Sequence, residues 1–177
     1  MNLTDIHRKM AKNVFLNIEL LLNDGVKEIS EYDVQFFMFN HFSKCLSNTQ
    51  YHAERERQGK VDCVVYERRR PILYYEIKTY YKNTEKLKQE KFDKDIDKIR
   101  NILIRKKDAH GYIFIAGNKS KFSEDVLKDF RFVSAKLWNN EKKWLTYTLP
   151  NRKKVRLRPS VKERYGRSIV ITWEIKL

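Results

Sequence analysis

The sequence predicts an α/β domain in which α-helices flank a mixed central β-sheet. Three closely spaced segments with strand character, at 51–57, 61–67 and 72–81, are separated by the polar turns QGK and RRRP, which predicts an antiparallel meander. A continuous apolar run, GYIFIAG at 111–117, predicts a buried central strand. Helical patterns precede and follow the meander, so we expect the sheet to be sandwiched by helices.

Two helices are expected before the meander. Residues 4–24 carry apolar side chains at helical spacing, and Gly25 marks the end of that helix. The second helix begins after Ser30, which fits an N-cap with Asp33 three positions later, a variant of the capping box.

The second half of the chain adds helices and strands to this arrangement. A polar-faced helix is expected over 84–107 and another over 123–137, and three strand-like segments follow residue 142. We interpret the 177 residues as a single domain, with a core at about 30–137 and a basic, β-rich extension at about 142–177.

The charge of the chain indicates a polyanionic partner. The formal net charge is +15 and the pI is about 9.7. The sequence has neither an apolar run of transmembrane length nor the apolar region of a secretory signal, and its basic residues are spread through the domain. We therefore expect nucleic acid and not a membrane as the partner. Two cysteines do not make a disulfide framework, which favours a cytoplasmic protein.

The stretch ILYYEIKTYY, at 72–81, carries an acid and a base in the middle of a predicted strand. Side chains alternate between the faces of a strand, so Glu76 and Lys78 point to the same side. A hairpin centred near Arg69 would place Asp62 of the preceding strand directly opposite Glu76. Directly opposed side chains have Cβ atoms about 5 Å apart.

Two carboxylates at that separation repel each other and favour a counter-charge. Mg²⁺ is commonly held by one or two carboxylates together with substrate phosphate, and it can polarise the phosphate and lower the pKa of a bound water. A neighbouring lysine can orient that water or stabilise developing charge. The alternative is a solvated, charged strand face. The tripeptide recurs as Glu174-Ile175-Lys176, but there no aspartate-bearing strand comes just before it.

The order helix, V-D-C-V-V, hairpin, Y-Y-E-I-K, helix resembles the PD-(D/E)XK nuclease superfamily, which has the restriction endonuclease-like fold. The resemblance covers roughly residues 30–117. It implies that Asp62 and Glu76 are the two metal-binding acids and Lys78 the catalytic lysine. It also implies that the backbone carbonyl of Ile77 is a further metal ligand.

The same resemblance suggests roles for residues around the motif. Val61 stands where the signature nominally has a proline, which is not a ligand. Glu31 is similar to a glutamate that many members carry on the helix before the meander, although an acid in a first helical turn is also favoured by the helix dipole. Four polar residues on the next helix could contact phosphates or simply form a solvated face: Lys88, Gln89, Lys91 and Lys98.

Further basic and aromatic residues are candidates for nucleic-acid contacts. Arg156 and Arg158 alternate along a predicted strand, and a cluster of Arg68, Arg69 and Arg70 lies at the predicted hairpin turn. Such side chains suit phosphate contacts, which fix position without reading sequence. Tyr80 shares the face of Glu76 and Lys78 and could touch the nucleic acid. The alternative for the basic residues is an ordinary solubilising surface.

These observations lead to two hypotheses. The first is a nuclease, expected to be an endonuclease, that depends on Mg²⁺ (Mn²⁺ may substitute) and hydrolyses DNA rather than RNA through Asp62, Glu76 and Lys78. Because two cuts in a duplex generally need two active sites, a homodimer would suit such an activity. The second hypothesis is a catalytically silent DNA- or RNA-binding module of the same fold.

Overall fold

The computed structural model describes residues 3–45, 50–55, 61–81, 88–118, 120 and 144–177. Within these residues the chain forms three helices and one seven-stranded mixed sheet. In chain order the elements are α1 (Leu3–Asn23), α2 (Glu31–Cys45), β1 (Tyr51–Glu54), β2 (Cys63–Glu67), β3 (Arg70–Tyr80), α3 (Gln89–Arg105), β4 (His110–Asn118), β5 (Leu145–Thr148), β6 (Lys154–Tyr165) and β7 (Ser168–Lys176). The helix expected at 123–137 lies outside the described residues.

The α/β class with a mixed sheet is therefore confirmed. The strand order is β1-β2-β3-β4-β7-β6-β5, and only the β3–β4 pair is parallel. Parallel neighbours need a crossover connection, and α3 lies in the segment that joins these two strands. β4 is the fourth of the seven strands and is buried from Gly111 to Gly117, as the apolar run predicts.

The antiparallel meander β1-β2-β3 is also present as predicted. Cys63 pairs with Tyr75, and the ladder shifts register between Val65 and Tyr66. This irregularity brings Glu67 opposite Arg70 at the turn, where Arg68 has a positive φ of 56°.

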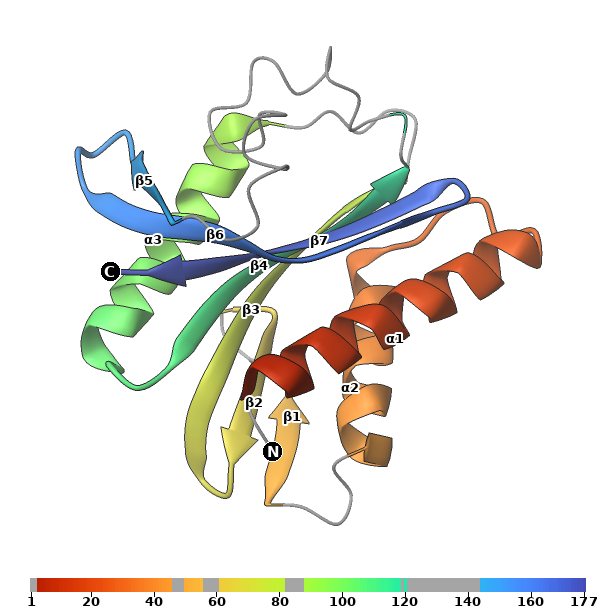
Figure 1. Ribbon diagram of the computed structural model, residues 1–177, viewed down its shortest axis with the longest axis horizontal. Coiled ribbons are helices and arrows are strands. Elements are labelled where there is room, and N and C mark those ends of the chain that lie inside the picture. The colour runs from red at the N-terminus through yellow and green to blue at the C-terminus, as the bar shows by residue number, and fades with distance from the viewer. Residues whose placement is uncertain (1–2, 46–49, 56–60, 82–87, 119, 121–143) are drawn as a thin grey trace.

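The last three strands belong to the same sheet as the meander. β7 lies between β4 and β6, and it pairs with both of them in antiparallel fashion. β5, β6 and β7 thus make up the part of the sheet beyond β4, which Figure 1 shows in blue.

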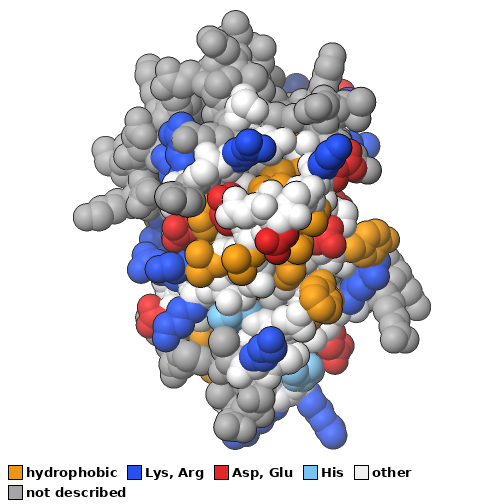
Figure 2. Space-filling model, turned by 90° about the vertical axis from the view of Figure 1, so that its right-hand side faces the viewer, with side chains coloured by type: hydrophobic (Ala, Val, Ile, Leu, Met, Phe, Trp, Pro, Cys, Tyr) orange, Lys and Arg blue, Asp and Glu red, His pale blue; other side chains and the backbone are white. Residues whose placement is uncertain are grey.

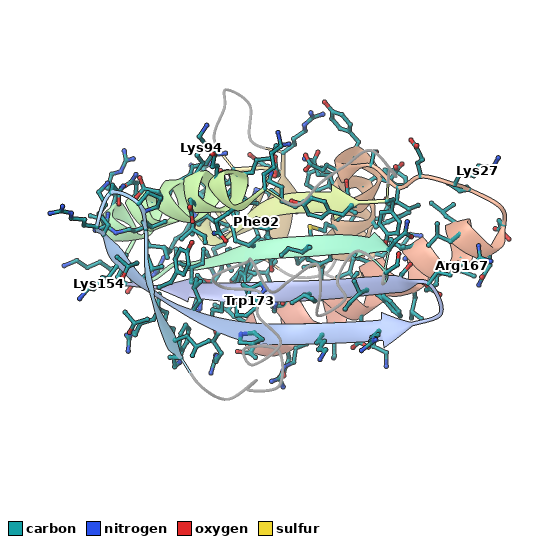
Figure 3. All side chains as sticks on the ribbon, turned by 90° about the horizontal axis from the view of Figure 1, so that it is seen from above. Lys27, Phe92, Lys94, Lys154, Arg167 and Trp173 are labelled. Atoms are coloured by element: carbon teal, nitrogen blue, oxygen red, sulfur yellow. The ribbon has the colours of Figure 1, made fainter. Side chains whose placement is uncertain are left out.

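Helices cover the two faces of the sheet and define two apolar layers. Figure 1 shows α3 on the left side of the sheet and α1 and α2 on the right. The α3 layer contains Phe92 and Trp173, both labelled in Figure 3. The α1/α2 layer contains Met10, Phe42 and Phe114. On the α1/α2 side, hydrophobic and acidic side chains occupy the middle of the surface and Lys and Arg side chains surround them (Figure 2).

The helix ends follow local sequence signals. The amide and hydroxyl of Ser30 both donate to Asp33 Oδ2, at 2.7 and 2.6 Å, and the Asp33 amide donates to Ser30 Oγ at 3.3 Å. This reciprocal cap confirms the predicted start of α2. Gly25 has φ of 90°, and the amide of Val26 donates to the Leu21 carbonyl, so α1 ends in a Schellman motif.

A buried histidine connects α1 to the centre of the sheet. His7 is fully buried, its Nδ1 lies 3.0 Å from the Tyr75 hydroxyl, and its Nε2 lies 2.8 Å from Thr172 Oγ1. Its ring stacks on Tyr112 with centroids 4.0 Å apart. Burial lowers the pKa of His7 from its ordinary 6.5 to about 3, so the folded protein holds this imidazole neutral.

None of the helices in the described part of the chain is both long and apolar enough to cross a membrane.

His7 predicts how stability depends on pH. The unfolded chain takes up a proton on this histidine below about pH 6.5 while the folded protein does not. The free energy of unfolding should therefore fall as pH drops from 7 to 5, by up to about 1.4 kcal/mol per pH unit from this group. Urea denaturation across that range should show a shallower dependence for His7→Gln than for the wild type. The control is His52→Gln, at an exposed position of β1, and an equal slope in both variants would contradict this account.

Candidate functional site

Glu76 and Lys78 lie on the face of β3 that α3 covers. Their neighbours on that face, Tyr74 and Tyr80, belong to the α3 layer, whereas Tyr75 and Ile77 belong to the α1/α2 layer. Glu76 is only 1% exposed. A carboxylate this deeply placed requires partners, because an unpaired buried charge is strongly disfavoured.

Asp62 lies in a bend one residue before β2. Since Cys63 pairs with Tyr75, the next position brings Asp62 opposite Glu76, as the hairpin argument predicts. Asp62 Oδ2 accepts a hydrogen bond of 2.7 Å from the amide of Ile77. This bond ties the carboxylate to the backbone between Glu76 and Lys78.

Two ion pairs join this face of β3 to α3. Lys98 Nζ lies 2.6 Å from Glu76 Oε1, and Lys78 Nζ lies 3.1 Å from Asp95 Oδ2. Glu76 and Lys78, two residues apart on the strand, thus pair with Lys98 and Asp95, which are three residues apart on the helix. Positions three apart share one face of a helix, so a single orientation of α3 makes both pairs.

Glu31 joins the cluster from the first turn of α2. Its Oε1 lies 3.7 Å from Lys78 Nζ. Lys78 Nζ also donates to the carbonyl of Ile77 at 3.1 Å. The ammonium group of Lys78 is therefore held between carboxylates that come from two different helices, and the Lys78 side chain is only 16% exposed.

The pKa shifts follow from burial and from the crowding of acids. Burial raises the pKa of Glu76; Lys98 opposes that shift, and Asp62 and Asp95 add to it. Burial likewise raises the pKa of Glu31, although Lys78 pulls it down. Burial alone would lower the pKa of Lys78, but Asp95 and Glu31 more than offset this, so its pKa lies above the ordinary value. Lys78 is consequently a cation at neutral pH.

Sequence reasoning missed the role of α3 in this site. Asp95 does not stand out in the sequence because it lies within an apolar stripe, next to Ile96, and the interpretations of Lys98 are a phosphate contact or part of a solvated face. Asp95 is 8% exposed. An acid among the buried positions of an amphipathic helix is the signal that could have found it, since such a group needs a buried partner.

Tyr80 does not fit its predicted role. It shares the face of Glu76 as expected, but it is 4% exposed and stacks on Phe92 with ring centroids 6.1 Å apart. It therefore packs in the α3 layer and is not placed to touch a nucleic acid. Lys88 and Lys91, at the start of α3, are exposed as a phosphate contact would require.

The arginine clusters lie away from the carboxylates. Arg68, Arg69 and Arg70 are at the β2–β3 turn and line a depression of about 560 Å³. Seven residues of strand separate Arg69 from Glu76, which is roughly 23 Å at about 3.3 Å per residue. Arg156 and Arg158 are on the opposite face of the sheet from Glu76, because Val155 and Leu157 occupy the α3 layer. The structure thus brings neither of these two arginine clusters into one site with Asp62.

Within the described ranges, no group of three or more His, Cys, Asp or Glu side chains is arranged to hold a metal ion. Glu76 is turned to Lys98, and Asp62 to the Ile77 amide. Cys63 is fully buried on the other face from Asp62, in the α1/α2 layer, as expected for a core thiol.

Comparison of this chain with protein-family models, with curated proteins and with solved structures found no match. The interpretation of the site therefore depends on its own residues.

The two ion pairs predict a pH-dependent loss of stability. Lys98→Met leaves the Glu76 carboxylate buried without its nearest cation. Because the Lys98 side chain is one-third exposed, we expect a loss of about 1–3 kcal/mol at pH 8, below the 3–5 typical of fully buried pairs. At pH 5 the loss should be smaller, since Glu76 has a raised pKa and is more readily protonated in the folded state.

Urea denaturation at the two pH values measures this difference. The matched control is Lys94→Met, which removes an exposed lysine from the same helix. A loss for Lys98→Met that is equal at both pH values would show that Glu76 does not depend on Lys98.

Proposed function

We propose that the chain hydrolyses phosphodiester bonds in DNA, as a metal-dependent nuclease with its site at Asp62, Glu76 and Lys78. The observation that carries this proposal is a cluster of four carboxylates and two lysines: Glu31, Asp62 and Asp95 lie around Lys78, and Glu76 joins the cluster through Lys98 and its proximity to Asp62 and Asp95. Two of these acids, Glu76 and Asp95, are buried, in a chain of net charge +15. A restriction endonuclease-like arrangement of the sheet is part of the same proposal.

The chemistry of these donor atoms suits a hard divalent cation, although their contacts in this structure are with lysines and a backbone amide. Asp62, Glu76 and the Ile77 carbonyl offer the oxygen ligands that Mg²⁺ and Mn²⁺ prefer. The cluster holds Glu31, Asp62, Glu76 and Asp95 against Lys78 and Lys98, so acids outnumber cations. Burial is the main cause of the raised pKa of Glu76, and the neighbouring Asp62 and Asp95 add to it. When bound, the metal would polarise the phosphate and lower the pKa of a water molecule.

The side chains of the chain have distinct roles in this proposal. Lys78 remains protonated and donates to a phosphate oxygen or to the attacking water, so it acts as a cation and not as a general base. Asp95 and Glu31 hold its ammonium group in place. Lys98 forms an ion pair with the Glu76 carboxylate and would have to move before that carboxylate binds a metal.

DNA is the proposed substrate, and RNA is less favoured. The same hypothesis includes a cytoplasmic location and a homodimer. The chain offers exposed apolar side chains for self-association: Leu16 and Leu20 on α1, and Tyr32 and Phe36 on α2.

One observation favours a second candidate, a nucleic-acid-binding module that cuts nothing. The ion pairs Glu76–Lys98 and Lys78–Asp95 give the acid and the base of β3 structural partners without any metal. In that case the charges serve to hold α3 on the sheet, and only the basic surface is functional.

Cleavage of supercoiled DNA separates the two candidates. With Mg²⁺ or Mn²⁺ the wild type should nick or linearise the plasmid, and EDTA should prevent this. Asp62→Asn, Glu76→Gln and Lys78→Met should each reduce the rate about 100-fold or more, because each removes a ligand or a charge that stabilises the transition state. Lys94→Met, on the exposed side of α3, should cut at the wild-type rate.

Circular dichroism of each variant checks that it is folded. Metal-independent binding with no cleavage by the wild type would reject hydrolysis and favour the silent module. Full activity in all three site variants would show that the site lies elsewhere. An RNA of the same sequence tests the preference for DNA.

A further inference from the structure

A second polar surface lies on the sheet face opposite Glu76 and Lys78. It is built from five side chains, Trp144, Arg156, Arg158, Lys176 and His110, around the buried Glu174, and we name it the basic grid. The register pairs Arg158 with Glu174, and Arg156 with Lys176. Its strand residues therefore come from neighbouring strands and point to the same face of the sheet. This is the face on which His7, near the start of α1, stacks on Tyr112.

The buried carboxylate of Glu174 holds the side chains of Arg158 and His110 in place. It is 4% exposed, its Oε2 accepts from Arg158 Nη2, and its Oε1 lies 3.3 Å from His110 Nδ1. Burial alone would raise the pKa of Glu174, but the hydrogen bonds from His110 and Arg158 lower it to about 2. The acid thus stays ionised and holds Arg158 in a defined position.

Trp144 is the aromatic centre of the basic grid. The Arg158 guanidinium carbon lies 4.5 Å from its ring centroid and Lys176 Nζ lies 4.7 Å from it. Arg156 is 5.9 Å away. The indole is partly exposed and lies next to cations that can donate to phosphates, and a stacking site for a base combines these two elements.

The pairing of Arg156 with Lys176 argues against a purely structural role. Like charges directly opposite each other on a sheet are destabilising. The single acid of the grid, Glu174, is shared by Arg158, His110 and, at 3.9 Å, Lys176. Arg156 Nε donates to the Leu177 carbonyl, so the cations outnumber the acid. Arg156 is exposed, and Lys154, labelled in Figure 3, extends the positive row along β6. An unbalanced row of this kind complements a polyanion.

We infer that the basic grid binds single-stranded nucleic acid. A single strand presents the flat faces of its bases, which can stack on Trp144, together with phosphates within reach of Arg156 and Lys176. A duplex keeps its base faces stacked internally and would use only the cations. The inference goes beyond the proposed hydrolysis and does not depend on it, because the basic grid and the Glu76 cluster lie on opposite faces of the sheet.

The experiment measures binding without catalysis. Fluorescence anisotropy of a labelled 12-nucleotide single strand and of the matching duplex is recorded with the full chain in EDTA. The wild type should bind the single strand more tightly than the duplex. Trp144→Leu should weaken single-strand binding about tenfold with little effect on the duplex, since stacking is lost.

Charge removal gives a second, independent readout. Arg156→Gln/Lys176→Gln should weaken single-strand binding at least tenfold and reduce the slope of log affinity against log salt by about 1.4, which is 0.7 for each of two phosphate contacts. The matched control is Lys27→Gln/Arg167→Gln, which removes the same charge from exposed positions shown in Figure 3. Circular dichroism confirms that each variant is folded.

Three results would overturn the inference: both double variants weaken binding equally, Trp144→Leu binds the single strand as the wild type does, or the chain binds vesicles of anionic phospholipid but no oligonucleotide. Because EDTA prevents metal-dependent cleavage, these results are separate from the plasmid assay. Loss of the basic grid's binding would leave the proposed hydrolysis standing, and absence of hydrolysis would leave the grid standing.

Discussion

The two ion pairs between β3 and α3, Glu76–Lys98 and Lys78–Asp95, are the constraint on which the rest of the arrangement depends. Glu76 and Asp95 are buried acids, and each is tolerable only because the other element supplies its ammonium group. Packing acts in the same place: a Cβ at Gly111 would lie 2.2 Å from Ile99 Cγ2, so the glycine lets α3 approach β4 closely. Charge and shape together fix one position of the helix, and that position creates the carboxylate cluster.

The two faces of the sheet consequently have different chemistry. On the α3 side, acids outnumber cations around Lys78, and burial opposes ionisation of Glu76. On the other side, cations outnumber acids, and Glu174 remains charged because His110 and Arg158 solvate it. The two glutamates stand in the same Glu-Ile-Lys tripeptide, yet their pKa values shift in opposite directions. Environment and not local sequence therefore decides what each tripeptide can do.

The sequence predicted those features of the fold that depend on interactions between residues close together in the chain. The meander, the buried strand at 111–117 and the Ser30–Asp33 cap depend on turn residues, apolar runs and capping bonds within a few positions. The opposition of Asp62 and Glu76 followed from hairpin geometry alone. The partnership with Asp95 and Lys98 could not be predicted in this way, because it depends on how α3 is rotated over the sheet. The face on which Arg156 lies depends on the order of the strands, which distant segments decide.

The place of β7 in the sheet has a consequence for biosynthesis. During translation, β4 emerges from the ribosome well before its partner, since residues 119–167 are made between the two strands. Until β7 arrives, one edge of the buried strand β4 has no neighbour from this sheet. An open edge of that kind can pair with other chains, so the nascent protein is exposed to aggregation until its final strand is in place.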